Sequence, residues 1–164
     1  MLIRDAKKED IEKINKIYNQ VVKNSNVTFD LEPFSIEKQH TWYKKHKKEG
    51  YPIIVAEVDN IVIGWASLSR WSDKKGYDYT AENSIYVDKA YRGQGIGYKL
   101  LKKLIEKAKQ KNIKNLIALI TEGNQGSINL HRKFGYEKVG NLKKVGHKFN
   151  QYYDVEIYQL IVSE

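Results

Sequence analysis

Cysteine is absent from the 164-residue sequence, and methionine and proline are scarce, with one and two residues respectively. Without cysteine the chain has no disulfide framework, no thiolate metal site and no cysteine nucleophile. Long apolar runs are missing as well, since no stretch of about 18 apolar residues occurs and the segment from Met1 to Asp5 contains no long apolar run. We therefore expect a cytoplasmic protein with neither a membrane span nor a signal peptide.

Arginine occurs at only four positions, although the net charge is +9. A basic chain can bind nucleic acid through the phosphates. Here the lysines are spread over several predicted helices and form no single tract interleaved with aromatic residues. We interpret most of them as solvated helix faces, so a nucleic-acid-binding module is a minor alternative. A basic surface would still attract a polyanionic ligand.

The length and the 41% hydrophobic content fit one domain over residues 1–164. Apolar periodicity predicts elements in the order β-α-α-β-β-β-α-β-α-β-β. The predicted helices cover 9–23, 35–48, a segment that begins near 97, and 124–134; the predicted strands include 51–58, 61–69, 77–87, 116–121, 136–145 and 152–162. The apolar run from Leu116 to Thr121 is typical of a buried strand, parallel to the one that ends at Val87. This order predicts an α/β fold with a mixed sheet and helices on both faces.

A glycine-rich loop joins the strand that ends at Val87 to the next helix, in the segment from Arg92 to Gly97. Glycines let the backbone turn sharply and approach a ligand closely, and a helix N-terminus offers unpaired N–H groups to a phosphate. The spacing fits neither G-x-G-x-x-G nor the P-loop pattern, since Tyr98 stands where the third glycine is needed and no Lys-Ser or Lys-Thr follows. The remaining pattern, Arg92-x-x-Gly95-x-Gly97, resembles the coenzyme A loop of the GNAT N-acetyltransferases.

Further segments extend this resemblance over the whole chain and narrow it to the phosphinothricin acetyltransferases. They are Ile3-Arg4-x-Ala6, Asn26-Val27-Thr28-Phe29, Glu32-Pro33, Val55-Ala56-Glu57-Val58, the run from Tyr77 to Val87, Gly146-His147-Lys148 and Asp154-Val155. The resemblance implies a mostly antiparallel sheet with a central parallel strand pair. It also implies acetyl-CoA as cosubstrate, direct transfer to an amine, and a homodimer.

Carried over position by position, the resemblance implies a cofactor site in three parts. Backbone groups of Ile85, Tyr86 and Val87 would pair with the pantetheine arm. The pyrophosphate would be held by the glycine loop, which consists of Arg92, Gly93, Gln94, Gly95, Ile96 and Gly97. Asn124 would contact the cofactor arm through its amide, while capping of the following helix is an equally good interpretation.

Two residues are expected to be catalytic, and no metal is expected. Glu82 matches the family's proposed general base, and a lone carboxylate between apolar strand residues can have its proton affinity raised by desolvation. His131 stands where relatives place the group that protonates the leaving sulfur; it either transfers a proton or lines the sulfur pocket. Of the other histidines, His40 and His46 are expected to be solvated.

The acceptor is expected to be a small amino acid with a second polar group, because cations and aromatic residues occur where the family binds substrate. The candidate cations are Arg70, Lys74 and Lys75, with Phe29 and Tyr77 as apolar walls. Ser72 replaces one family cation, and lysine replaces arginine at Lys74, which loses bidentate geometry.

These two departures argue against phosphinothricin itself and leave methionine sulfoximine, methionine sulfone or another small amino acid open. A protein N-terminus or a polyamine is the alternative acceptor, and a non-catalytic module that binds coenzyme A is the alternative class.

Overall fold

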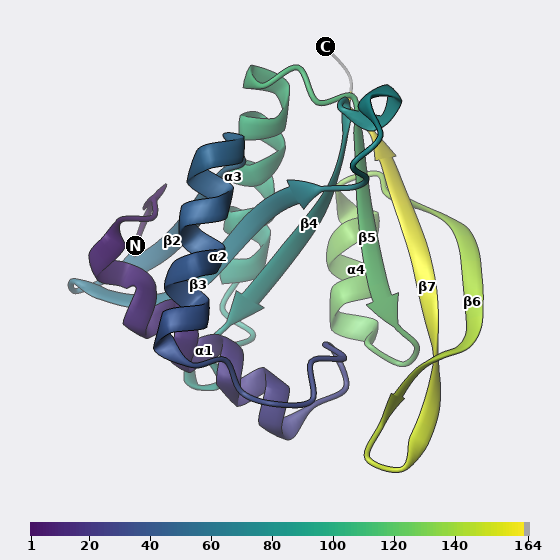
Figure 1. Ribbon diagram of the computed structural model, residues 1–164, viewed down its shortest axis with the longest axis horizontal. Helices are drawn as coiled ribbons and strands as arrows, with labels where there is room; N and C mark the ends of the chain where they lie inside the picture. The colour runs from purple at the N-terminus through teal and green to yellow at the C-terminus, as the bar shows by residue number, and fades with distance from the viewer. Residues whose placement is uncertain (163–164) are drawn as a thin grey trace.

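The computed structural model describes residues 1–162 as a seven-stranded sheet in the order β1-β2-β3-β4-β5-β7-β6 (Figure 1). The strands are β1 (Leu2–Asp5), β2 (Ile53–Val58), β3 (Ile61–Arg70), β4 (Thr80–Val87), β5 (Asn115–Thr121), β6 (Glu137–Lys148) and β7 (Gln151–Ile161). The helices are α1 (Ile11–Asn24), α2 (Ile36–Glu49), α3 (Ile96–Gln110) and α4 (Gln125–Lys133), with short 3-10 turns at Lys8–Asp10, Lys75–Tyr77 and Lys89–Tyr91. All neighbouring strands are antiparallel except β4 and β5. The predicted fold class, a mixed and mostly antiparallel sheet with one central parallel pair, is confirmed.

Local sequence signals explain several element boundaries. Ser35 caps α2 by accepting a hydrogen bond from the Lys38 N–H at 3.1 Å, as its type and position predict. Asp59 and Asn60 have φ angles of 48° and 63°, so both are left-handed, as a tight turn between β2 and β3 requires.

Some predicted strand boundaries are wrong. The strand expected over 51–58 begins at Ile53, and the strand expected over 136–145 ends at Lys148. The strand expected from Tyr77 begins only at Thr80, because the Tyr77 N–H donates to the Lys74 carbonyl at 3.0 Å and closes a 3-10 turn instead.

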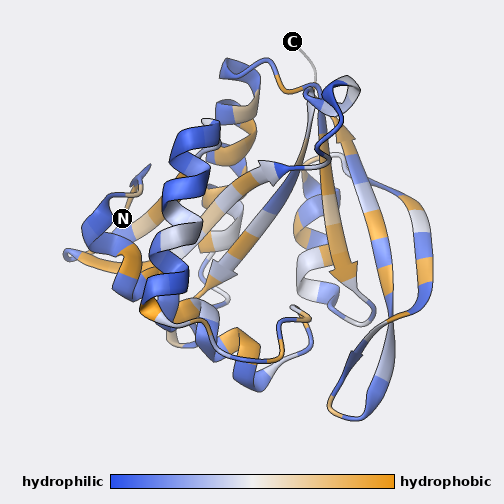
Figure 2. Ribbon diagram, in the orientation of Figure 1, coloured by the Kyte–Doolittle hydropathy of each residue, from blue (hydrophilic) through white to orange (hydrophobic). Residues whose placement is uncertain are grey.

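Two apolar cores cover the two faces of the sheet (Figure 2). On one face α3 and α4 pack against the strands, and Leu100, Leu101 and Leu104 of α3 are fully buried. On the other face α1 and α2 cover β2 and β3, with Ile14 and Trp65 among the buried residues. Burial of these side chains is the main source of stability. No helix within residues 1–162 has both the length and the apolar character that crossing a bilayer requires.

The sheet is divided in the middle, where β4 and β5 pair over only three residues each. The pairs are Thr80 with Asn115, Ala81 with Leu116, and Glu82 with Ile117. Beyond Glu82, β4 stays paired with β3, and β5 stays paired with β7 as far as Thr121. The two central strands therefore diverge and leave the edge of β4 from 83 to 87 without a neighbouring strand (Figure 1).

The loop between α1 and α2, residues 25–35, lies over this division and is tied to the opposite half of the sheet. Thr121 Oγ1 of β5 donates to the carbonyl of Asn26 at 2.8 Å. Lys148 Nζ of β6 donates to the carbonyl of Thr28 at 3.0 Å, and burial lowers the pKa of this ammonium group. These bonds make the α1–α2 loop a fixed wall.

Candidate active site

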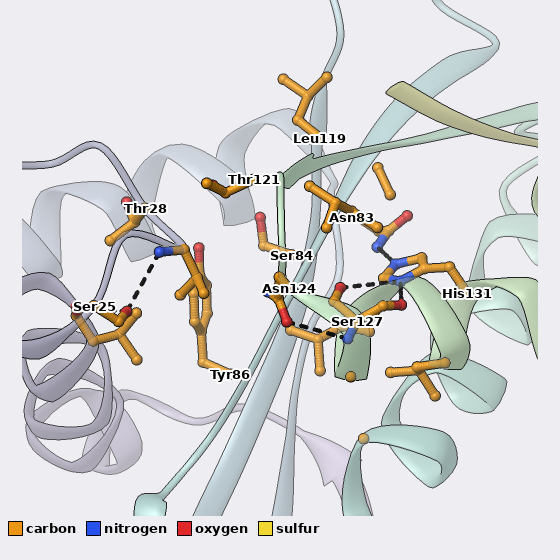
Figure 3. A pocket seen from close by; sticks show the side chains of 18 of the residues that line it. Ser25, Thr28, Asn83, Ser84, Tyr86, Leu119, Thr121, Asn124, Ser127 and His131 are labelled. Atoms are coloured by element: carbon orange, nitrogen blue, oxygen red, sulfur yellow. Dashed lines mark hydrogen bonds between the residues drawn. The ribbon is translucent and has the colours of Figure 1, made fainter. Parts of the chain in front are cut away.

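A cavity of about 860 Å³ follows the division of the sheet from the glycine loop to the α1–α2 loop. Figure 3 shows its two sides, with Ser25 and Thr28 towards α1, and Ser127 and His131 on α4. Tyr86 of β4 lies between them. The cavity therefore borders both faces of the sheet, as a site needs when two substrates approach from opposite sides.

The glycine loop has the geometry that an anion needs. Gly93 and Gly95 both have a φ of 76°, and a Cβ built on either would meet nothing within 4 Å. Gly95 is the N-cap of α3, and no side chain hydrogen-bonds to the first turn from that position, so its N–H groups are open to a ligand. The exposed Arg92 donates from Nε to the Val87 carbonyl at 3.1 Å, which holds its guanidinium beside the loop. A diphosphate fits this loop, because open space, N–H donors and a cation meet there.

The other predicted cofactor residues line the same cavity. Ile85, Tyr86 and Val87 line the cavity and lie on the stretch of β4 that pairs with β3 but not with β5. Asn124 caps α4, since its Oδ1 accepts from the Ser127 N–H at 3.3 Å, and its residue also borders the cavity. The capping interpretation is therefore confirmed, and contact with the cofactor arm stays a prediction.

Glu82 lies where β4 and β5 begin to diverge, and it borders the cavity. Desolvation by burial raises the pKa of its carboxyl group, as expected from its position between apolar strand residues. No hydrogen bond or ion pair reaches that carboxyl from residues 1–162. A half-buried carboxylate with no compensating partner takes up a proton readily, so it suits a general base.

His131 is buried in a chain of four hydrogen-bonded groups. Tyr136 Oη donates to Asn83 Oδ1 at 2.9 Å, and Asn83 Nδ2 is 2.9 Å from His131 Nε2. On the other side of the ring, His131 Nδ1 is 2.8 Å from the Ser127 carbonyl oxygen, so Nδ1 carries the proton and Nε2 accepts (Figure 3). Burial lowers the pKa of His131. Because both nitrogens are engaged, the geometry favours the pocket-lining role over proton transfer.

The predicted substrate residues do not all come together within this chain. Phe29 borders the main cavity, and its ring lies against Gly146 of β6. Arg70 instead pairs with Asp78 at 3.4 Å, and Lys74 and Tyr77 are exposed on the loop before β4. None of these last three residues lines the described cavities.

The expectation that His46 is solvated is wrong. It is 7% exposed, and it bonds to the Trp42 carbonyl through Nδ1 at 3.0 Å and to Ser69 Oγ through Nε2 at 3.1 Å. The lysines around it in α2 are exposed, and they hid the fact that His46 faces inward, as Gln39 does.

Sequence reasoning also missed Asn83 and Ser84. Alternation along β4 was the available signal, because successive side chains of a strand point to opposite faces.

A glycine loop shaped for a diphosphate, an unpaired strand edge for an extended arm and a carboxyl of raised pKa define a coenzyme A-dependent acyltransferase site. Residues 8–136 match the acetyltransferase (GNAT) family, and the chain belongs to that family. The expectations for family, fold and enzyme class are thereby confirmed.

Comparison with individual proteins gives the same answer. The chain is 37% identical to an L-methionine sulfoximine/L-methionine sulfone acetyltransferase of Pseudomonas paraeruginosa, over 96% of this chain and 92% of the relative. An acetyltransferase structure from Salmonella typhimurium with acetyl-CoA is 34% identical, with a TM-score of 0.97 over 100% of this chain and 95% of the other.

A phosphinothricin acetyltransferase from Sinorhizobium meliloti, also in complex with acetyl-CoA, is 31% identical. Its TM-score is 0.96 over 99% of this chain and 88% of the other. The expected cosubstrate, acetyl-CoA, is therefore confirmed, and the resemblance to phosphinothricin acetyltransferases holds.

Proposed function

We propose that residues 1–164 act as one cytoplasmic N-acetyltransferase domain that acetylates the amino group of a small amino acid of the methionine sulfoximine, methionine sulfone or phosphinothricin type. Residues 163–164 lie outside the described part of the chain. The observation that carries the proposal is the position of Glu82, a carboxyl of raised pKa at the point where the sheet divides. The names of the relatives support the acceptor class.

The residues of the chain divide the work between binding and proton removal. The N–H groups of the glycine loop and Arg92 hold the diphosphate, and the open edge of β4 aligns the pantetheine arm. Bound acetyl-CoA supplies an activated acyl group as a thioester. Glu82 accepts a proton from the acceptor ammonium, so that a neutral amine faces the carbonyl carbon. Overall the N–C bond forms, the C–S bond breaks, and an ammonium and a thioester become an amide, a thiol and one released proton.

We also propose a homodimer as the working form. Arg70, Lys74 and Tyr77 lie outside the described cavities of their own chain, and two of them are exposed. A second copy could receive these side chains beside its acceptor site, which would unite the predicted substrate residues across an interface.

The missing cation at Ser72 makes phosphinothricin the weakest acceptor of the three.

Replacing Glu82 with glutamine tests the proposal, because the amide keeps the shape of the side chain but cannot take the proton. We expect kcat/KM for methionine sulfone to fall by roughly 10²- to 10⁴-fold. Thiol release from acetyl-CoA is the assay, and the acceptor panel includes a polyamine and an N-terminal peptide. Calorimetric affinity for coenzyme A should not change, and exposed Glu137→Gln on β6 is the matched control.

The pH dependence gives a second measurement on the same variant. Glu82 is active when ionised, so its raised pKa places the rise of activity at a higher pH than an ordinary glutamate would. The Glu82→Gln variant should lose that limb of the profile. Equal rates for the variant and the parent would exclude Glu82 as the base.

A further inference from the structure

A second, smaller cavity of about 200 Å³ adjoins the main one and shares Ser84 and Tyr86 with it. We call it the side cavity. It lies on the α1/α2 face of the sheet, over β3 and β4. Three cross-strand pairs run from the catalytic position into it: Ser69 with Glu82, Ser67 with Ser84, and Trp65 with Tyr86.

Side chains on one face of a strand are spaced by about 6.7 Å along it, because they recur every two residues. This spacing is close to the length of a methionine-sized side chain. A group bound at Glu82 would therefore extend into the side cavity.

Aromatic rings form one part of the walls of the side cavity. Tyr18 of α1 lies edge-on to Tyr86 at 5.1 Å and to Trp65 at 6.0 Å, measured between ring centroids. Trp42 of α2 lies 5.2 Å from Trp65, and Phe34 lies 5.1 Å from Tyr18. These mutual contacts fix the rings, which form a preformed wall that suits methylene and methyl groups. The rest of the lining is polar and consists of Asp30, Gln39, Ser67, Ser69 and Ser84.

One polar atom in these walls lacks a partner. Trp65 is 3% exposed, and its indole Nε1 has no hydrogen-bond partner within residues 1–162. Buried N–H groups are almost always hydrogen-bonded, because an unpaired one forfeits about 1–3 kcal/mol of solvation. An indole N–H can only donate. No acceptor within residues 1–162 reaches this N–H, so an oxygen of a bound ligand would be its partner.

The charges around the side cavity restrict what that ligand can be. No lysine, arginine or histidine is among the described residues that line it. The Asp30 carboxylate borders it and accepts a hydrogen bond from Tyr18 Oη. His46 hydrogen-bonds to Ser69, one of the lining residues, through Nε2. Burial lowers the pKa of His46, so its ring stays neutral at pH 7. An anionic group would find no cationic partner among the lining residues and would lie near the Asp30 carboxylate, and an ammonium group could not accept from the indole. Lys38 packs against the wall from outside the lining, with its Nζ 3.9 Å over the Phe34 ring.

We propose that the side cavity binds the side chain of the acceptor amino acid. It selects a neutral group that ends in hydrogen-bond-accepting oxygens, such as a sulfone or sulfoximine, over an anionic phosphinyl group. The Trp65 indole N–H donates to one of these oxygens, and the surrounding rings hold the methylene and methyl carbons. This inference deepens the proposed function and depends on it for the position of the amine at Glu82.

An NMR titration tests the contact directly. The chain has three tryptophans, whose indole N–H signals in ¹⁵N-labelled protein can be assigned with Trp42→Phe and Trp71→Phe. With coenzyme A bound, addition of methionine sulfone should move the Trp65 signal downfield and leave that of exposed Trp71 in place. Phosphinothricin at the same concentration should move it far less. If methionine sulfone is acetylated while the Trp65 signal stays fixed, the inference is overturned.

Kinetics with the Trp65→Phe variant separates recognition from structural support. We expect kcat/KM for methionine sulfone to fall about tenfold. The same constant for norleucine, which has a similar shape but no acceptor oxygens, should stay within about twofold. Equal losses for both amino acids would show a purely structural role and overturn the inference.

If the parent acetylates none of methionine sulfone, methionine sulfoximine and phosphinothricin, the proposed function fails. The NMR titration then decides the binding claim without turnover.

Discussion

Replacing Gly146 with alanine tests how tightly Phe29 closes the acceptor side of the cavity. A Cβ at Gly146 would lie 2.2, 2.4 and 2.6 Å from three atoms of the Phe29 ring, distances that no real contact allows. Gly146 does not have a positive φ, so the alanine backbone itself is unstrained. The ring must therefore leave its place against β6.

The expected cost follows from the burial of Phe29. Full burial of a phenylalanine side chain stabilises a protein by about 1.5–3 kcal/mol, and Phe29 is half-buried. We expect Gly146→Ala to lower the free energy of unfolding by about 1 kcal/mol. The kcat/KM for the acceptor should fall as well, because the moved ring no longer walls the cavity.

A double-mutant cycle measured by urea unfolding makes this prediction specific. Phe29→Ala alone should cost about 1 kcal/mol, and adding Gly146→Ala to it should cost nothing further, since the new methyl group then has space. Gly140→Ala on the same strand is the matched control, because its Cβ would meet Ile157 at an ordinary 3.5 Å. If Gly146→Ala costs the same with and without Phe29, the packing described here is wrong.

Two further predictions concern the glycine loop and the hydrogen-bonded chain. Gly95→Val places a branched residue at a φ of 76° and fills open space in the loop, so calorimetry should show at least tenfold weaker binding of coenzyme A. The control is Gly76→Ala, which also has open space but is distant from the loop, and it should bind coenzyme A normally. Unchanged affinity in Gly95→Val would refute the site. His131→Ala should lower the free energy of unfolding by about 1–3 kcal/mol, because Asn83 and Ser127 lose their hydrogen-bond partner. The pH profile of kcat/KM should keep its shape. Loss of a titrating limb from that profile would instead show that His131 is the proton donor.

The sequence was sufficient to predict the elements and the cofactor side of the site. Strand β5 could be predicted as buried and parallel from its continuous apolar run, and α2 from its Ser35 cap. The glycine loop could be predicted because all of its residues are consecutive, so the local pattern contains the whole feature. Glu82 depended on the family resemblance, since a strand glutamate alone is as easily a surface residue.

Features made by distant segments could not be predicted in this way. Trp65 and Tyr18 meet across the α1/α2 face, and their approach depends on how α1 packs on β3. The burial of His46 was hidden because the surrounding lysines dominate the composition of α2. Tertiary packing decided these positions, and single-sequence periodicity does not report which faces meet.

The short pairing of β4 with β5 has a consequence for the stability of the whole molecule. Three residue pairs form the seam between the two halves of the sheet, and the rest of that seam is open to a ligand. The pantetheine arm of the cofactor, bound in that open part, would bridge the two halves of the sheet, β1–β4 and β5–β7. A ligand that binds only the native state, at a concentration a hundred times its Kd, raises the free energy of unfolding by about 2.7 kcal/mol. The supply of coenzyme A in the cell would then set how much of this enzyme survives heat and proteolysis, as well as how fast it works.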